Sequence, residues 1–419
     1  MARGMLGRNL IAIDVGTTKI CVLVAEVDSS GSIEILGMGQ YPSHGLKRGV
    51  VVNINETVNS IKKAVKEAEA MSGAEIDSAI VGISGSHIKS FNSKGVVAVR
   101  NKNVTQYDID RVVETAKAVV MPEDREIIHV FPQYFRVDGQ EYIQDSLGMH
   151  GIRLESQVHI ITGAISSAQN IIKSCEMAGV QVSDIVLEQI ASADAVLTPT
   201  EKKLGVGILD IGGGTSDFAI YKEGGIRHSK VLPIAGNHFT SDLAIGLGVP
   251  LSRAEELKKI YGFVAEDIFL EFDRDKIDIE LSTSENKTVD LYSLFEILEP
   301  RAQEVLNLIK GEVDDFRLKS FMPMGLVLTG GGSLLKGMDL VAHNVFGIKA
   351  RVGIPIGYSK SDEQSTQAPD ILKSPIYSTA YGLLIYALKE KDNKRMASKS
   401  DSLFGWVFKS MKSWVYDFL

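Results

Sequence analysis

The feature that most constrains the fold of this chain is a pattern that occurs twice. Residues 10–25 read L-I-A-I-D-V-G-T-T-K-I-C-V-L-V-A, and residues 207–221 read G-I-L-D-I-G-G-G-T-S-D-F-A-I-Y. Each copy has an apolar strand, an aspartate, a glycine-containing polar turn and a second apolar strand. Because repeated segments indicate repeated structural units, the sequence predicts two related α/β lobes.

Other segments complete this outline. Apolar residues at helical spacing predict a helix over 56–72, and short apolar runs predict strands near 33–38 and 79–83. Residues 85–156 differ in character, because short strands alternate there with one helix near 108–118. This stretch resembles a small α+β insertion in the first lobe.

Composition excludes several classes of protein. The chain has 419 residues, of which 44% are apolar and 23% charged, which is ample for a hydrophobic core and unlike a disordered chain. Its net charge of −8 argues against a globally basic nucleic-acid binder. No uncharged apolar run reaches the roughly 18 residues of a membrane-spanning helix. Cys21 and Cys175 lie in apolar runs and are expected to be buried free thiols in a reducing, cytosolic compartment.

The two repeated turns have the composition of phosphate-binding turns. Successive backbone N–H groups in such a turn form a nest for phosphate oxygens, and glycine allows the backbone to approach closely. An aspartate beside a phosphate makes chemical sense when Mg²⁺ lies between them, so Asp14 and Asp210 are the predicted metal ligands. Lys19 would add a positive charge. The predicted phosphate-binding residues are Gly16, Thr17, Thr18, Lys19, Gly212, Gly213, Gly214 and Thr215.

A single turn of this kind is usually an ordinary hairpin. Two copies, together with a third glycine-rich turn at Gly330, Gly331 and Gly332 after the apolar residues 326–329, favour a nucleotide site. The chain has no Walker A sequence. It also lacks a Rossmann fingerprint, because each phosphate turn leads into a second strand rather than a helix.

These motifs resemble those of the actin, Hsp70 and sugar-kinase superfamily. D-V-G-T-T-K and D-I-G-G-G-T-S-D are similar to its two phosphate motifs, and residues 326–337 are similar to its adenosine motif. Residues 186–197 and 375–388 occupy the places of its two connecting helices. The resemblance implies a two-lobed actin-like (ribonuclease-H-like) α/β ATPase fold, with ATP and Mg²⁺ between the lobes.

The resemblance also suggests residues for the adenine and for catalysis. A helix at 252–262 would lie beside the adenine, with Glu255 and Lys258 as candidates, although an exposed helix face carrying paired charges explains them equally well. Asp14, Asp210 and Asp217 are candidates to position water, and none is assigned as the catalytic base. Weak or absent ATP hydrolysis is therefore expected. The eight histidines are scattered without ligand spacing, and no metal role is predicted for them.

The position of the insertion narrows the family, because the cell-division actin homologue FtsA carries an α+β subdomain at this place. The chain resembles FtsA throughout, including residues 46–53, 81–87, 128–133, 163–165, 233–236 and 351–355. The resemblance implies a protein that tethers the FtsZ ring to the cytoplasmic membrane at the division septum, self-assembles into protofilaments or dimers, and helps to recruit later division proteins. The FtsZ C-terminal peptide would dock within about 235–325.

The C-terminus provides separate evidence for a membrane contact. At 100° per residue, most large apolar side chains of residues 402–419 fall on one face, with Lys409 and Lys412 on the other and Trp406 at the boundary. This pattern predicts an amphipathic helix that lies in a membrane surface rich in anionic lipid, although docking on the protein's own body is an alternative. The predicted membrane-contacting residues are Leu403, Phe404, Trp406, Val407, Phe408, Lys409, Met411, Lys412, Trp414, Val415 and Phe418.

The expected organisation follows from these segments. The first lobe comprises 1–84 and 158–200, the inserted subdomain 85–157, and the second lobe 201–388; a charged linker at 389–401 and the amphipathic helix at 402–419 follow. Two alternatives remain open: a small-molecule kinase of the same superfamily, and a pilus-assembly actin homologue that binds an inner-membrane partner. A kinase would not explain the C-terminal segment.

Overall fold

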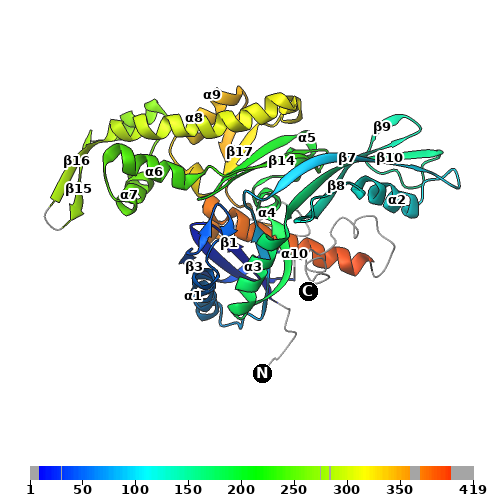
Figure 1. Ribbon diagram of the computed structural model, residues 1–419, viewed down its shortest axis with the longest axis horizontal. Helices are drawn as coiled ribbons and strands as arrows, with labels where there is room; N and C mark the ends of the chain where they lie inside the picture. The colour runs from blue at the N-terminus through cyan, green and yellow to red at the C-terminus, as the bar shows by residue number, and fades with distance from the viewer. Residues whose placement is uncertain (1–8, 30, 274, 283–284, 359–368, 398–419) are drawn as a thin grey trace.

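A five-stranded mixed sheet forms the centre of the first lobe in the computed structural model, which describes residues 9–29, 31–273, 275–282, 285–358 and 369–397. The sheet runs in the order β11 (Gln181–Leu187), β6 (Ser78–Ile83), β1 (Leu10–Val15), β2 (Lys19–Val27) and β3 (Ile33–Pro42). Strand β1 is antiparallel to β2 and parallel to β6. The first phosphate turn therefore lies at the end of a central strand (Figure 1).

The second lobe repeats this sheet. Its order is β14 (Gly225–Leu232), β13 (Ser216–Lys222), β12 (Val206–Ile211), β17 (Leu326–Thr329) and β18 (Ala350–Val352). Strand β12 is antiparallel to β13 and parallel to β17, as β1 is to β2 and β6. The predicted internal repeat is therefore confirmed at the level of topology.

Helix α1 (Ile54–Ser72) illustrates how the local sequence specifies an element. The Asn53 side chain accepts a hydrogen bond from the Glu56 N–H at its start, and Gly73 ends the helix in the left-handed conformation. The buried face includes the apolar residues on which the prediction rested: Val58, Ile61, Ala64, Val65 and Ala68. Helix α1 packs against β2, β3 and α3 (Ile165–Met177).

Two helices lie between the lobes, as the resemblance implied. Helix α4 (Glu188–Val196) follows β11, and α10 (Ser378–Ala397) packs along it and against β1 and β6 (Figure 1). Gly382 makes the crossing possible, because a Cβ at this position would come within 1.8 Å of the Ala191 carbonyl oxygen. The short helix α5 (Pro199–Leu204) then leads into β12.

Further helices complete the second lobe. Helices α6 (Gly236–Leu247) and α7 (Leu251–Tyr261) pack together, and α6 also contacts the long α8 (Leu291–Asp315). The hairpin of β15 (Lys276–Ser282) and β16 (Glu285–Asp290) projects at one end, and α9 (Met338–Phe346) contacts α8 and β18 (Figure 1). The remaining short elements are β4 (Leu46–Lys47), β5 (Val50–Val51), η1 (Glu266–Glu271), η2 (Leu318–Phe321), η3 (Gly331–Leu334), η4 (Asp370–Leu372) and η5 (Pro375–Tyr377).

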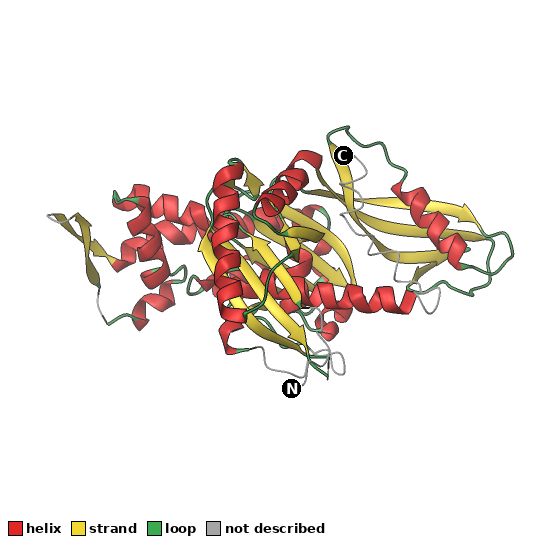
Figure 2. Cartoon of the chain, turned by 90° about the horizontal axis from the view of Figure 1, so that it is seen from below, coloured by secondary structure: helices red, strands yellow, loops and turns green. Residues whose placement is uncertain are grey.

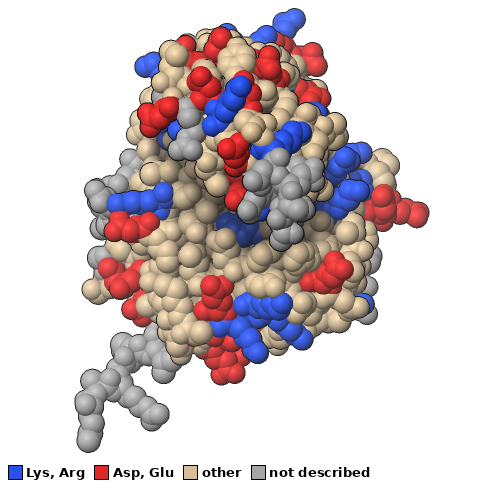
Figure 3. All heavy atoms as spheres, turned by 90° about the vertical axis from the view of Figure 1, so that its left-hand side faces the viewer, with Lys and Arg blue, Asp and Glu red and all other residues tan. Residues whose placement is uncertain are grey.

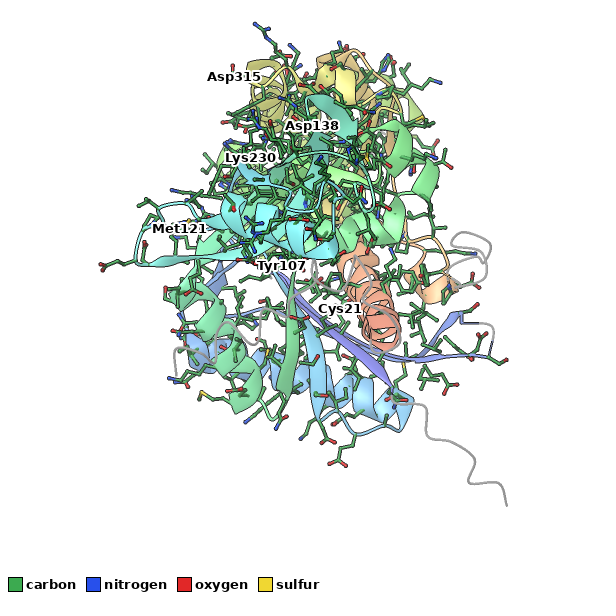
Figure 4. The ribbon with its side chains drawn as sticks, turned by 90° about the vertical axis from the view of Figure 1, so that its right-hand side faces the viewer. Cys21, Tyr107, Met121, Asp138, Lys230 and Asp315 are labelled. Carbon is green, nitrogen blue, oxygen red and sulfur yellow. The ribbon has the colours of Figure 1, made fainter. Side chains whose placement is uncertain are left out.

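The inserted segment has a sheet and a core of its own. Its strands are β7 (Lys89–Ala98), β10 (Arg153–Ala164), β8 (Arg125–Val137) and β9 (Gln140–Ile143), and α2 (Gln106–Lys117) covers one face (Figure 2). A separate apolar cluster that includes Val112, Phe135 and Leu154 lies between α2 and the sheet. In Figure 4, the labelled residues Tyr107, Met121 and Asp138 belong to this inserted domain, and the labelled residue Cys21 belongs to the first-lobe sheet.

The structure differs from the expected boundaries at two places. Strand β10 continues to Ala164, so the inserted sheet extends past the expected limit at residue 157. Helix α10 continues to Ala397, so most of the segment expected to be a flexible linker at 389–401 is helical. The amphipathic segment 402–419, with all the predicted membrane-contacting residues, lies outside the described residues. Within the described part of the chain, no helix is both long enough and apolar enough to cross a membrane.

The crossing of α4 and α10 provides a test of the fold. We expect Gly382→Ala to lower the free energy of unfolding by roughly 1–3 kcal/mol, because the added methyl group must push the two helices apart. Gly311→Ala in α8 is the matched control. A Cβ there meets nothing within 4 Å, so the same substitution should stabilise the protein by about 0.5–1 kcal/mol. Urea denaturation of the three proteins measures both effects, and equal shifts in the same direction would contradict this packing.

Candidate functional site

The two repeated turns meet tip to tip between the lobes. A Cβ added to Gly213 would lie 2.3 Å from Thr18 Cγ2, and one added to Gly214 would lie 2.4 Å from Thr17 Oγ1. Any larger residue at these two glycines would therefore collide with the opposite turn. The structure thus brings together the predicted residues Gly16 to Thr18 and Gly212 to Thr215.

The tips of both turns carry unused hydrogen-bond donors. The N–H of Gly16 donates to the Lys19 carbonyl, and the N–H of Gly212 donates to the Thr215 carbonyl, which closes each turn. Within the described residues, the N–H groups of Thr17, Thr18, Gly213 and Gly214 donate to no protein acceptor. Because successive backbone N–H groups without a protein acceptor can bind an anion, these four groups form a candidate anion site.

Helices α6 and α7 support the second turn from behind. The N–H groups of Gly236 and Asn237 donate to the Gly212 and Gly213 carbonyls at 2.9 and 2.8 Å. Lys258 Nζ donates to the Gly236 carbonyl at 3.0 Å, and it also contacts Thr240 and Glu255. Lys258 and the Glu255 carboxylate are therefore already paired with each other, one contact away from the phosphate turn.

Asp14 and Asp210 occupy equivalent places in the two lobes and are both largely buried. Burial raises the pKa of Asp14 to about 6; Lys19 acts to lower it and Asp210 to raise it further. Burial also raises the pKa of Asp210, although its Oδ2 accepts hydrogen bonds from Ser192 at 2.5 Å and Thr379 at 3.2 Å. The charge of Asp210 thus acts on Asp14 in the other lobe.

Asp217 lies directly opposite Asp210 in the antiparallel pair of β12 and β13, so both side chains are on one face of the sheet. Its Oδ1 accepts a hydrogen bond of 2.6 Å from Ser84 Oγ in the first lobe. Burial raises the pKa of Asp217 to about 7; the hydrogen bond from Ser84 acts to lower this pKa, and Asp210 acts to raise it.

A fourth carboxyl group, Glu188, was missed by the sequence analysis. It begins α4 and lies over Gly82 of β6, where an added Cβ would come within 3.3 Å of Glu188 Cγ. Its pKa lies well above the ordinary value because of burial and the nearby Asp14, Asp217 and Asp210. A signal was present in the sequence, because Glu188 directly follows the apolar strand β11, just as Asp14 and Asp210 lie one residue before the ends of β1 and β12.

Lys19 does not point to the turn tips. Its Nζ donates to the Ile376 carbonyl at 2.5 Å and lies 4.7 Å from the centre of the Tyr377 ring. Through its charge it acts to lower the pKa values of Asp14 and Asp210. Lys19 therefore joins the first turn to the start of α10 and partly balances the carboxylates.

The third glycine turn packs against the end of β12. A Cβ on Gly330 would lie 2.2 Å from Asp210 Oδ1, and one on Gly332 would lie 2.3 Å from Ile211 Cγ2. Gly331 faces Ile376, the residue whose carbonyl group binds Lys19. The three predicted glycine turns therefore converge on one place.

This donor set suits a phosphate group accompanied by a divalent cation. Mg²⁺ is usually held by one or two carboxylates, waters and phosphate oxygens, and Asp14 and Asp210 supply two carboxylates beside free N–H groups. In the described ranges, no group of three or more His, Cys, Asp or Glu side chains has the arrangement of an all-protein metal cage. Figure 3 shows a hollow between the upper and lower parts of this face, with Lys or Arg atoms inside it.

The carboxyl cluster predicts a pH-dependent stability. The pKa of Asp217 is about 7 in the folded protein against an ordinary 3.8, so the folded state binds the proton more tightly between these values. Stability should therefore fall as the pH rises from about 4 to about 7. Asp217→Asn removes this loss and should be more stable than the wild type by about 1–4 kcal/mol above pH 7, with a smaller difference at pH 4.

Urea denaturation between pH 4 and 8 measures this difference. Asp315→Asn at the exposed end of α8 is the matched control, and should leave the shape of the pH curve unchanged (Figure 4). Parallel curves for wild type and Asp217→Asn would contradict the assignment.

Comparison with known families identifies two segments of the chain. A model of the "SHS2 domain inserted in FTSA" matches residues 85–162, and a model of "Cell division protein FtsA" matches residues 207–382. The first match covers the inserted sheet and α2, and the second covers the β12–β13 turn, the third glycine turn and the start of α10.

Curated relatives match almost the whole chain. Cell division protein FtsA of Pseudomonas aeruginosa is 41% identical over 421 residues, which cover 99% of each protein. Cell division protein FtsA of Escherichia coli (strain K12) is 34% identical and covers 97% of each.

Solved structures share the fold at low sequence identity. A protein in the "PilM-PilN type IV pilus biogenesis complex" has a TM-score of 0.65 at 15% identity, over 90% of this chain and 98% of that one. MreB5 of Spiroplasma citri bound to AMPPNP has a TM-score of 0.55 at 15% identity, over 93% and 99%. These likenesses confirm the predicted two-lobed actin-like ATPase fold, and the pilus protein supports no more than the fold. On the evidence of its nearly full-length relatives, the chain belongs to the cell division protein FtsA family.

Proposed function

We propose that this chain is an ATP-binding, actin-like cell-division protein that attaches the FtsZ ring to the cytoplasmic membrane. The observation that carries the nucleotide part is the meeting of two glycine turns with free N–H groups beside Asp14 and Asp210. Its membership of the FtsA family carries the cell-division part.

In this proposal the turn tips bind the phosphates. The N–H groups of Thr17, Thr18, Gly213 and Gly214 donate to phosphate oxygens. The adenosine lies between α7 and the third glycine turn. These two segments already approach each other, because a Cβ on Gly262, after α7, would be 2.7 Å from Leu335 Cδ2, after the turn. Glu255 and Lys258 then act mainly by holding α7 to α6 and to the second turn.

Asp14 and Asp210 would hold Mg²⁺, which supplies charge neutralisation for the phosphates. Glu188 is a fourth candidate to position the attacking water, beside Asp14, Asp210 and Asp217. Burial and the neighbouring Asp14, Asp217 and Asp210 raise the pKa of Glu188 well above the ordinary value. None of these carboxyl groups is assigned as the catalytic base, and weak or absent ATP hydrolysis remains the expectation.

Binding of Mg²⁺–ATP at this site should release protons. Asp14 has a pKa of about 6, and a bound cation favours the charged carboxylate and so lowers this pKa. At pH 6 about half a proton should leave Asp14 for each nucleotide bound. Calorimetry in buffers of different ionisation enthalpy measures this number.

Asp14→Asn should remove this proton release and weaken the binding of Mg²⁺–ATP. Asp315→Asn, remote on α8, should change neither. An unchanged proton count in Asp14→Asn would exclude Asp14 as a cation ligand, and no heat of binding for the wild type would exclude the nucleotide site itself.

The membrane part of the proposal rests on residues 402–419. Their apolar face and the two lysines fit the surface of an anionic membrane. Burial of a large apolar side chain contributes roughly 1.5–3 kcal/mol, but ordering the segment costs up to about 1–2 kcal/mol per residue. One copy therefore binds modestly, and an assembly that presents many copies binds far more tightly.

FtsZ and the protein itself are the proposed partners. The FtsZ C-terminal peptide would dock on the subdomain at about 235–325, which includes α6, α7 and α8. Head-to-tail copies of the chain would form protofilaments or dimers on the inner face of the membrane at the septum. The inserted domain would contact neighbouring copies or later division proteins.

Co-sedimentation with anionic liposomes and Mg²⁺–ATP tests the membrane part. The full chain should pellet, and a chain that ends at Ser400 should stay in the supernatant, because the apolar face is gone. Both tryptophans of the protein, Trp406 and Trp414, should shift their emission to the blue on binding. A labelled FtsZ C-terminal peptide should enter the pellet only with the full chain.

A matched pair of charge substitutions separates a membrane contact from a general effect of charge. Val415→Glu on the apolar face should abolish pelleting, whereas Ser413→Glu on the polar face should reduce it only slightly. If the truncated chain pellets as well as the full chain, another surface binds the membrane and this part of the proposal is wrong.

A further inference from the structure

Packing contacts and two side-chain contacts of Ser84 join the two lobes at the phosphate turns. The packing contacts are Thr18 against Gly213 and Thr17 against Gly214. The contacts of Ser84 are a 3.3 Å contact between its Oγ and Thr215 Oγ1 and the hydrogen bond from Ser84 Oγ to Asp217 Oδ1, which we call the inter-lobe hydrogen bond. The inter-lobe hydrogen bond is the shorter of these two contacts at 2.6 Å, and both of its residues are buried.

The acceptor of this bond belongs to the second phosphate turn. Asp217 comes two residues after Thr215, and Thr215 Oγ1 lies 3.3 Å from Ser84 Oγ. Ser84 therefore faces both the end of the turn and the carboxyl group that is opposite Asp210. Movement of the second lobe away from Ser84 must displace this turn.

The donor of this bond is tied to the first phosphate turn. Ser84 directly follows β6 and precedes Gly85, where the inserted domain begins. Gly49 packs closely on Gly85, since a Cβ on Gly49 would lie 2.7 Å from the Gly85 Cα. The Gly49 N–H donates to Thr17 Oγ1 at 2.9 Å. Contacts thus run from Thr17 through Gly49 and Ser84 to Asp217 and link both turns from behind.

We propose that Ser84 is a positioning residue whose inter-lobe hydrogen bond holds the lobes closed around the phosphate turns and so sets how fast a nucleotide enters and leaves. This inference rests on the proposed function that the cleft binds ATP. Ser84 acts through Asp217 and the second turn rather than by touching the nucleotide.

The proposal has a specific kinetic consequence. Both atoms of the bond belong to the protein, so opening the cleft breaks it whether or not a nucleotide is bound. Loss of the bond should therefore increase the open fraction of the free and the bound protein by the same factor. Association and dissociation should both accelerate, and the equilibrium dissociation constant should stay nearly constant.

Stopped-flow fluorescence with a mant-labelled ATP and Mg²⁺ measures both rates on the full chain. Ser84→Ala should raise both rate constants about 3–10-fold and change their ratio less than twofold, as expected for one lost hydrogen bond. Ser84→Thr keeps the hydroxyl group and should restore wild-type rates. Ser174→Ala is the matched control, because Ser174 is a buried serine of the same lobe whose hydroxyl bonds the Asn170 carbonyl within α3.

Two results would overturn the proposal. Unchanged rates in Ser84→Ala would mean that the hydrogen bond does not limit opening. If only the dissociation rate constant rises in Ser84→Ala, and the equilibrium dissociation constant rises by the same factor, then Ser84 contacts the nucleotide or supports the site only structurally.

A measurement without nucleotide separates this inference from the proposed function. Both native cysteines are fully buried, so nitroxide labels would react selectively at Lys66→Cys on α1 and Asn307→Cys on α8, both exposed. Pulsed electron resonance should give a narrow distance distribution for the parent and for Ser174→Ala, and a broader, longer one for Ser84→Ala. If the distributions coincide, Ser84 does not hold the lobes together; if they differ but mant-ATP fails to bind the parent, only the proposed nucleotide function is wrong.

Discussion

The meeting of two hairpin turns from different lobes is the contact on which the rest of the structure depends. Thr17 and Thr18 fill the space that side chains on Gly213 and Gly214 would need, so the two turns approach to van der Waals distance only because these positions are glycines. Among the residues that the structure describes, no acceptor pairs with the backbone N–H groups at the tips. The fold places unpaired donors at its centre, which is the condition for binding an anion there.

The carboxyl groups around these turns impose a second constraint. Asp14, Asp210, Asp217 and Glu188 are gathered from both lobes and from α4, and burial raises the pKa of each. Lys19 is the cation that acts on Asp14 and Asp210, while it is itself bound to the Ile376 carbonyl. Such a cluster costs stability when all its members are charged, which is typical of a site built for a cation or a proton rather than for folding.

Much of this site was predictable from local sequence. Strand–Asp–turn–strand repeats specify hairpins, and the period of apolar residues in 56–72 specified the buried face of α1. The inserted domain was recognisable, but its strands are longer than predicted, because the polar and apolar residues of β7 and β8 alternate too weakly to mark strand ends. The linker expected from residue 389 is helical as far as Ala397, since lysine, glutamate and methionine are good helix formers and extend α10.

The sequence by itself determined the two lobes, the three glycine turns and the aspartates that end their strands, because these are properties of residues close together in the chain. Only the tertiary structure decided that Ser84 bonds Asp217, that Glu188 joins the aspartates, and that Lys19 turns to Ile376. Each of these contacts joins residues from distant parts of the chain. Their partners are set by how two sheets and two connecting helices pack, and no local pattern of apolar and polar residues encodes that packing.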